Sequence, residues 1–436
     1  MPYFITFDAI KYNVMRKLSF LFFAGLVIPA FVLAQTPRIT MNTNQEIGST
    51  LFFQFETDPD DINEVVVHGA NRVGRMFILT SQTIILEGNV TRFSCYGCDL
   101  TSLDVSQNPA LIILDCTFNQ LARLDISKNA SLEQLWCEEN NLKTLDISHN
   151  PRLTVLNCSH NPVDSLNVSK NIHLVSIMCN ETQLTQLNLS NNTALKNLSC
   201  ANSKIQLLDV TKNPNLIHLN CSENELKQLD VSQNKLIQVL NCHDNNLLVL
   251  NLSENEDLTT LDCGKNPLRS FDVSHNQKLK ELLVKDLNLT TLNLSNNASI
   301  MYLDCSENHL IDLDLLHLDQ LRVLDCSNNS FNTLTLSGNN MLQYIGLNGN
   351  IFSACEIDNL FRQLPVRSSE PGSIVLKYGD SSLQGTDGCR DYLATEKNWQ
   401  VLSIFLEPCE EDEHTDHHFH EIPQKISNTG NYVCNE

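Results

Sequence analysis

Two consecutive stretches decide the fold: LTSLDVSQNPALIILDCTFNQ at residues 100–120 and LARLDISKNASLEQLWCEENN at residues 121–141. Both have 21 residues and carry leucine, cysteine and asparagine in the same slots. Twelve such copies run without insertion from Leu100 to Ile351. A single copy is too short to bury its own leucines, so the sequence predicts that the copies stack into a solenoid with one shared core.

Each slot of the repeat has a physical interpretation. Leu114 and Cys116 alternate with outward residues, and this period of two predicts a short strand that points both side chains inward. Stacked copies then form a parallel sheet with strands about 4.8 Å apart. Asn119 follows the strand, where a side-chain amide can satisfy backbone groups of the turn. The half-motif L-x-x-L-D-V/I-S-x-N adds a second inward row, such as Leu103 and Val105.

Eleven cysteines recur in one slot of the repeat, with Val284 in place of one further cysteine. They are Cys95, Cys116, Cys137, Cys158, Cys179, Cys200, Cys221, Cys242, Cys263, Cys305 and Cys326. Side chains that point the same way from neighbouring parallel strands suit stacking better than bridging, and eleven thiols cannot all pair. We therefore predict reduced structural thiols packed as small apolar groups. Disulfides or a metal are the alternatives, and we predict no metal because thiolate charges are costly in a leucine core.

The remaining cysteines lie outside this row. Cys98 forms a C-x-x-C with Cys95, which leaves a redox role as an alternative. The candidate disulfides involve two pairs that flank the C-terminal cap and the tail, with the connectivity open. These residues are Cys355, Cys389, Cys409 and Cys434. The histidines of the tail motif CEEDEHTDHHFHE leave cation binding as an alternative to a solvated acidic tail.

The repeat L-x-x-L-x-C-x-x-N-x-L, in residues 111–121, resembles the leucine-rich repeat. Its 21-residue length and its cysteine resemble the internalin-type repeats of bacterial surface proteins, in particular their cysteine-rich subgroup. The resemblance covers residues 100–351. It implies an α/β-type leucine-rich-repeat solenoid with a curved parallel β-sheet on the concave side, a β-rich N-terminal cap and an α/β C-terminal cap.

We expect five segments along the chain. Residues 1–34 read as a signal peptide, with a basic start at Arg16, an apolar run and a small-residue cleavage site before Gln35; Met15 is an alternative start, and a retained anchor is the alternative reading. Residues 35–99 form the β-rich N-terminal cap and a half repeat, 100–351 the twelve repeats, 352–405 the α/β C-terminal cap, and 406–436 an acidic, histidine-containing flexible tail. The chain is therefore expected to be secreted, extracellular or at the cell surface.

Composition and motifs narrow the function. The chain has 51 acidic and 29 basic residues, a net charge of −22, which argues against nucleic acid and anionic membranes as partners. We expect no membrane insertion after signal cleavage. The sequence has no G-x-S-x-G, H-E-x-x-H, G-x-x-x-x-G-K or G-x-G-x-x-G motif. We therefore predict that it is not an enzyme and uses no cofactor.

Side chains that flank the inward strand residues do not pack in the core, and they line the concave side. Those expected to bind a partner are Tyr96, Gln134, Trp136, Glu138, Met178, Tyr302 and Tyr344. Aromatic side chains among acidic and polar ones suit a protein surface. We predict a non-enzymatic, secreted or surface protein-binding module, adhesin-like, whose ligand is a protein such as a surface or host protein. A carbohydrate-binding or envelope-scaffold protein is the alternative, and the oligomeric state stays open.

Overall fold

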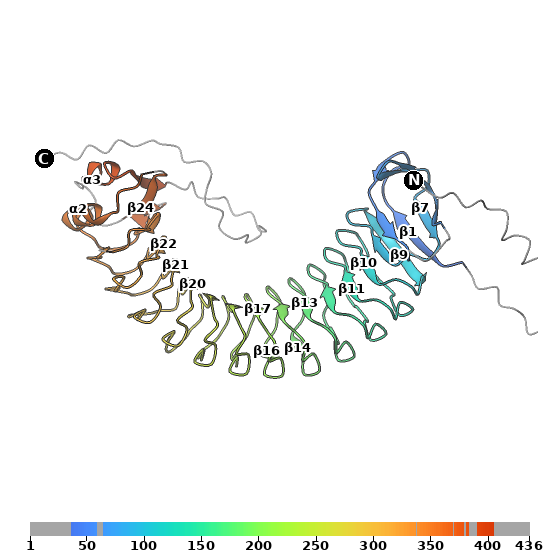
Figure 1. Ribbon diagram of the computed structural model, residues 1–436, viewed down its shortest axis with the longest axis horizontal. Coiled ribbons are helices and arrows are strands. Elements are labelled where there is room, and N and C mark those ends of the chain that lie inside the picture. Colours follow the sequence, from blue (N-terminus) through green and yellow to red (C-terminus); the bar gives the residue numbers. More distant parts are fainter. Residues whose placement is uncertain are drawn as a thin grey trace, which may run out of the picture. The chain divides into compact units, whose positions relative to one another are not determined.

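The computed structural model describes residues 36–58, 64–336, 338–368, 370–378, 381–382 and 390–404. The described residues from 37 onward form one compact unit, in which the repeats stack into a curved solenoid with a parallel sheet on its concave side (Figure 1). The predicted leucine-rich-repeat architecture is confirmed. The array strands are β10 (Ile113–Asp115), β11 (Gln134–Trp136), β12 (Val155–Asn157), β13 (Ser176–Met178), β15 (Asn197–Ser199), β17 (His218–Asn220), β18 (Val239–Asn241), β19 (Thr260–Asp262), β20 (Glu281–Leu283), β21 (Tyr302–Asp304), β22 (Val323–Asp325) and β23 (Tyr344–Gly346).

Each array strand buries its middle residue and turns its two flanking side chains outward, as in β11, where Leu135 is buried. Neighbouring strands pair in strict register, so that equivalent residues of successive repeats stand side by side. A second, two-stranded parallel sheet forms from β14 (Gln186–Asn188) and β16 (Leu207–Asp209), which lie away from the concave sheet (Figure 1).

In its described residues the N-terminal cap contains β-strands and no helix. Its strands are β1 (Arg38–Thr43), β2 (Thr50–Leu51), β3 (Gln54–Glu56), β4 (Val66–His68), β5 (Ala70–Val73), β6 (Met76–Leu79), β7 (Thr83–Glu87), β8 (Arg92–Ser94) and β9 (Leu100–Gln107). One sheet has the order β4-β7-β1-β9 and a second the order β2-β6-β5. The strand β3 pairs antiparallel with β8, and β8 pairs parallel with β10, so the cap continues directly into the array sheet.

The C-terminal cap contains α2 (Ala354–Gln363), β24 (Gly372–Tyr378), β25 (Ser381–Ser382), α3 (Tyr392–Thr395) and β26 (Trp399–Ile404). Ser353 caps the start of α2, since its hydroxyl accepts a hydrogen bond from the Glu356 N–H and contacts the Glu356 carboxylate. The strand β24 extends the array sheet beyond β23. The buried Trp399 packs against Gly372 and donates its indole N–H to the carbonyl of Pro365, at 2.8 Å.

Two rows of asparagines hold the turns of successive repeats together. After the strand, Asn119 donates to the carbonyls of Cys95 and Cys116, each at 2.9 Å, and accepts from the Leu100 N–H at 2.8 Å. On the opposite turn, Asn129 donates to carbonyls of the preceding repeat, at 3.0 Å and 2.8 Å. Equivalent contacts recur along the array, so both rows serve the structure rather than a ligand.

One repeat departs from the pattern more than the others. Most repeats have asparagine in the slot after the strand, and two have Thr182 and Ser203 there. In this repeat the slot holds the buried Leu287, and the turn contains two left-handed residues, Asp286 at φ 52° and Asn288 at φ 56°. Asn308 of the next repeat compensates by accepting from the N–H groups of Leu287 and Leu289, at 3.1 Å and 2.9 Å. The strand β20 still pairs in register on both sides, so the irregularity is confined to the turn.

Candidate functional site: the concave face

We define the concave face as the first and third residues of each array strand and the residue after the cysteine. In the repeat that contains β11 these are Gln134, Trp136 and Glu138, and all three are partly buried. Trp136 stands between Asp115 and Asn157 of the neighbouring strands. Since those neighbours lie about 4.8 Å away, a large side chain is flanked on both sides and leaves mainly its outer part to solvent.

The structure places the predicted aromatic and sulfur residues on this face, but not in one cluster. Met178 shares a row with Trp136, with Asn157 between them. Tyr302 and Tyr344 share another row, far along the array, with Val323 between them. The strands β15 to β20 separate the two groups. A partner that contacts both groups must therefore extend along much of the array.

Tyr96 differs from the other predicted residues because it is the most open of them, with 54 % of its surface exposed. Its ring meets that of Phe118 edge-on, with centroids 5.2 Å apart. By contrast, Trp136, Met178, Tyr302 and Tyr344 are only partly exposed, because neighbouring strands cover part of each side chain.

Acidic and amide side chains at the third strand position have a structural role that was not predicted from the sequence. The Asp115 carboxylate accepts from the Thr117 N–H at 3.2 Å, and Asp304 and Asp325 accept in the same way at 2.9 Å and 3.0 Å. Each such contact closes an Asx turn at the end of the strand. The recurring pattern Asp or Asn, cysteine and a small residue contains this signal.

The residue two places after the cysteine adopts the left-handed conformation throughout the array. The φ angles lie between 47° and 56° at Phe118, Glu139, His160, Glu181, Asn202, Glu223, Asp244, Lys265, Asp286, Glu307 and Asn328. This conformation is strained for residues other than glycine. It turns the chain sharply behind the strand, where the asparagine row then holds it.

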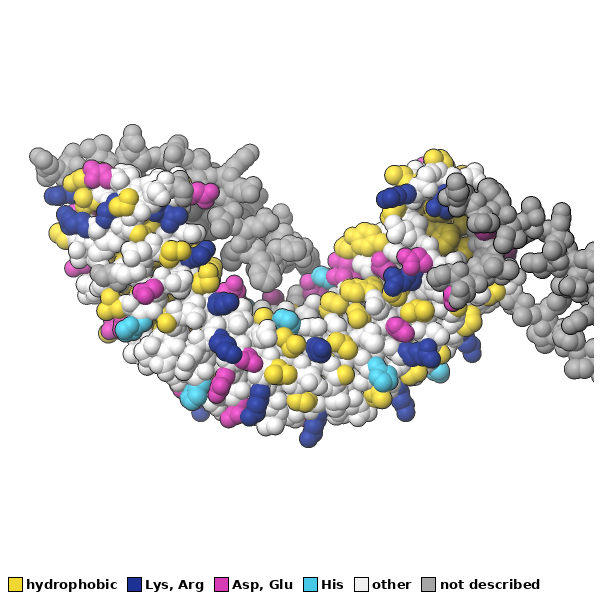
Figure 2. Space-filling model, viewed as in Figure 1, with side chains coloured by type: hydrophobic (Ala, Val, Ile, Leu, Met, Phe, Trp, Pro, Cys, Tyr) yellow, Lys and Arg dark blue, Asp and Glu magenta, His cyan; other side chains and the backbone are white. Residues whose placement is uncertain are grey.

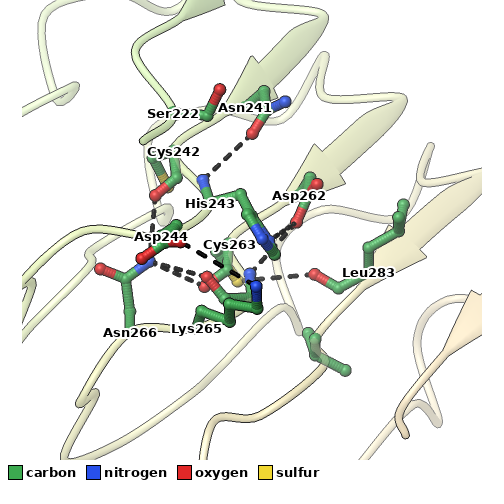
Figure 3. A network of polar contacts seen from close by, with 12 residues as sticks. Ser222, Asn241, Cys242, His243, Asp244, Asp262, Cys263, Lys265, Asn266 and Leu283 are labelled. Carbon is green, nitrogen blue, oxygen red and sulfur yellow. Dashed lines mark hydrogen bonds and ion pairs between the residues drawn. The ribbon is translucent and has the colours of Figure 1, made fainter. Parts of the chain in front are cut away.

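Figure 3 shows this arrangement at the boundary between two repeats. His243 lies against the Asp262 carboxylate, with Nδ1 and Oδ1 3.2 Å apart, and its own N–H donates to Asn241. Behind the face, Asn266 donates to the carbonyls of both Cys242 and Cys263, each at 3.0 Å. The imidazole is thereby held in place by its contact with the Asp262 carboxylate.

The C-terminal half of the face is strongly acidic. Burial raises the pKa of Tyr302 to about 12, and the nearby carboxylates of Asp304, Asp325 and Glu281 add to the effect. Burial, with the charge of Asp325, also raises the pKa of Asp304. Lys285 contacts Glu307 at 3.1 Å. This part of the face therefore repels anions.

All eleven cysteines of the row are unbridged and fully buried in the structure. Burial raises their thiol pKa values, to about 12 for Cys158 and Cys200. Cys98 is also buried, its thiol lies 3.4 Å from the Phe52 carbonyl, and burial raises its pKa to about 12. Thiols held in the protonated form are poor nucleophiles, which argues against redox chemistry at the C-x-x-C.

Several predictions fall outside the described part of the chain. Cys355 is exposed and unbridged, but Cys389, Cys409 and Cys434 lie outside the described residues, so the two disulfides stay a prediction. The signal peptide and the acidic tail also lie outside them. Among the described residues, no group of three or more histidines, cysteines and carboxylates is placed to hold a metal ion. None of the helices described there is long and apolar enough to cross a membrane.

Neither a protein-family model nor a curated protein matches the sequence. Solved structures do. The functional domain of InlJ from Listeria monocytogenes, which includes a cysteine ladder, is 28 % identical with a TM-score of 0.61, over 74 % of this chain and 76 % of that one. The internalin InlF of the same species has 20 % identity and a TM-score of 0.55, over 60 % of this chain and 82 % of that one. A leucine-rich-repeat protein of Leptospira interrogans has 23 % identity and a TM-score of 0.56, over 62 % and 74 %.

The last two similarities show the fold alone, whereas the first is to a domain that itself includes a cysteine ladder. Its presence in the InlJ domain matches the eleven buried cysteines that recur every 21 residues here. The chain is therefore an internalin-like leucine-rich-repeat protein whose repeats carry a cysteine ladder.

Proposed function

We propose that this chain is an exported, non-enzymatic module that binds a protein partner through its concave face. The observation that carries the proposal is that different positions of the repeat have different roles. Leucine, cysteine and asparagine slots are taken by the core and the turns, whereas the outward strand positions hold Trp136, Met178, Tyr302 and Tyr344, partly exposed on a rigid sheet. Large side chains in such places are the usual anchors of protein interfaces.

The electrostatics of the face agree with a protein partner. Aromatic groups stand beside carboxylates such as Glu138 and Asp304, in a chain of net charge −22. A partner surface that combines apolar pockets with basic residues would complement this pattern. Because the sequence predicts export, a protein at a surface, of a host or of the producing cell, fits the expected location.

The test is a pull-down with the tagged chain from residue 35 onward, followed by affinity measurement with the captured partner. Tyr302→Ala with Tyr344→Ala, and separately Trp136→Ala, should weaken binding at least about tenfold, roughly 1.4 kcal/mol, with unchanged melting. The matched control is Lys128→Ala with Lys212→Ala, two exposed lysines outside the face, which should bind like wild type.

Two results would overturn the proposal. One is full partner binding by the concave variants together with loss in the lysine control. The other is the absence of a protein partner combined with specific binding on a glycan array, which would favour the carbohydrate-binding alternative.

A further inference from the structure

A pocket of about 730 Å³ lies where the N-terminal cap meets the first repeats. Its size falls within the roughly 300–1,000 Å³ typical of ligand sites. The pocket floor is the array sheet itself, continued into the cap by β8 and β3. Two rows of outward side chains cross this floor in register. One row runs Glu56, Arg92, Ile113, Gln134 and the other runs Gln54, Ser94, Asp115, Trp136.

The wall of the pocket comes from a different part of the cap. The antiparallel strands β5 and β6 supply Arg72 and Phe77, and the turn between them supplies Arg75. Phe77 stacks on Phe53, with ring centroids 3.9 Å apart, and Phe53 meets Phe93 of β8 edge-on at 6.4 Å. This buried aromatic stack fixes the wall against the floor, so the pocket is preformed.

Within the described residues, some charged side chains of the pocket have an oppositely charged or hydrogen-bonding partner side chain, whereas others have none. On the floor, Arg92 lies 3.5 Å from the Glu56 carboxylate, and Asp115 accepts from the Ser94 hydroxyl at 2.8 Å. On the wall, Arg72 and Arg75 are exposed, and within the described residues neither has an ion-pair partner; Arg72 donates only to the carbonyl of Gly74. Three arginines against two carboxylates make this end of the face cationic.

That cationic end stands out because the rest of the molecule is acidic. Glu138 lies beside Trp136 at the edge of the pocket, and farther along the same face lie Glu281, Asp304 and Asp325. Figure 2 shows basic, acidic and hydrophobic side chains gathered where the cap meets the first repeats. An anionic segment would be repelled by the acidic half and drawn to the arginines, which sets both where it binds and which way it points.

We propose that this pocket, here called the cap pocket, binds an acidic peptide segment in which an apolar side chain stands beside one or two carboxylates. Arg72 and Arg75 receive the carboxylates, because a guanidinium offers paired donors that match their geometry. The apolar side chain packs on Trp136 and the partly exposed Phe55. The inference rests on the proposed function and assigns one end of the partner to the N-terminal end of the array.

An anionic glycan is the competing ligand class, since a sugar carboxylate would also meet the arginines. The lining favours a peptide, because Trp136, Phe55 and Ile113 together offer an apolar surface to an apolar side chain. Gln54, Gln134 and Ser94 suit the backbone amides of an extended segment.

The experiment titrates the full chain with the capped pentapeptide GDFDG, its neutral isostere GNFNG, and sialyllactose against lactose. Intrinsic fluorescence is a local reporter, because the chain has two tryptophans and Trp399 is buried in the other cap. We expect GDFDG to bind at least about tenfold more tightly than GNFNG, with an effect that added salt weakens. Arg72→Gln with Arg75→Gln should abolish the difference between the two peptides.

The matched control is Arg123→Gln with Arg152→Gln, two exposed arginines outside the pocket, which should leave the preference intact. Equal affinity for GDFDG and GNFNG, no binding of either at about millimolar concentration, or tighter arginine-dependent binding of sialyllactose would each overturn the inference. These failures are separable from failure of the proposed function, because that function is tested independently with Tyr302 and Tyr344 at the other end of the face.

Discussion

Asn119 reaches back more than one full repeat and donates its side-chain amide to the carbonyl of Cys95, 2.9 Å away. The same amide donates to the carbonyl of Cys116 in its own repeat. A single side chain thus ties two adjacent strands together at their ends. Because equivalent asparagines recur along the array, the stability of each repeat depends on its neighbour.

This relationship predicts the cost of removing one asparagine. Asn140→Ala should destabilise the protein by about 1–3 kcal/mol, because it leaves the buried Leu121 N–H without its partner and removes one of the two amide donors to the Cys116 carbonyl. Urea unfolding followed by circular dichroism measures the change. The control is Asn141→Ala, next in sequence and exposed, which should change little. Equal effects of the two substitutions would contradict the assigned role.

The buried thiols predict a steep loss of stability at alkaline pH. Burial raises the thiol pKa of Cys158 and Cys200 to about 12, against 9.0 in the unfolded chain. Above pH 9 the unfolded state loses thiol protons that the folded state keeps. Stability should therefore be fully present below pH 9 and fall as the pH rises toward 12, by up to about 1.4 kcal/mol per pH unit for each thiol. Urea midpoints measured from pH 7 to pH 11 test this.

Cys200→Val should reduce that slope, because it removes one titrating group while it keeps an apolar side chain. Cys200→Ser should instead cost about 1–3 kcal/mol at neutral pH, since it places a hydroxyl in apolar surroundings. A maleimide should label few ladder cysteines in the native protein and all of them after unfolding. Ready native labelling, or an oxidised ladder, would refute the interpretation as packed thiols.

The left-handed position two residues after each cysteine offers a stabilising substitution. Glu223 has a φ of 52°, where glycine is free of strain. Glu223→Gly should leave the free energy of unfolding unchanged or raise it by up to about 1 kcal/mol, and the melting temperature should follow. The β-branched Glu223→Val should lower the melting temperature. Glu225→Gly, at an exposed position outside this series, is the control and should not stabilise. A drop with Glu223→Gly as large as that with valine would argue against strain there.

Removal of the C-terminal cap should expose the end of the core. Without residues 352–405, the buried Ile345 and Leu347 of the last repeat lose their cover, and the truncated chain should aggregate. Deletion of residues 410–436 should leave the unfolding transition in place. Size-exclusion chromatography with circular dichroism distinguishes the two. A monomeric, fully folded chain without the cap would show that the cap is assigned wrongly.

The sequence by itself determined the solenoid, the inward leucine and cysteine rows and the asparagine turns. These features follow from local spacing that recurs twelve times, so that each repeat supports the interpretation of the others.

Only the tertiary structure decided how the cap meets the array. Arg72 and Arg75 belong to no repeat, and their place beside Trp136 depends on the antiparallel pairing of β3 with β8 and on the stack of Phe53 with Phe77. The sequence also did not predict the left-handed residues, because positions such as Phe118 and Lys265 are not glycine. The reason is physical: spacing encodes contacts between equivalent residues of a periodic array, whereas the packing of a non-repeating cap is set by unique long-range contacts that no period records.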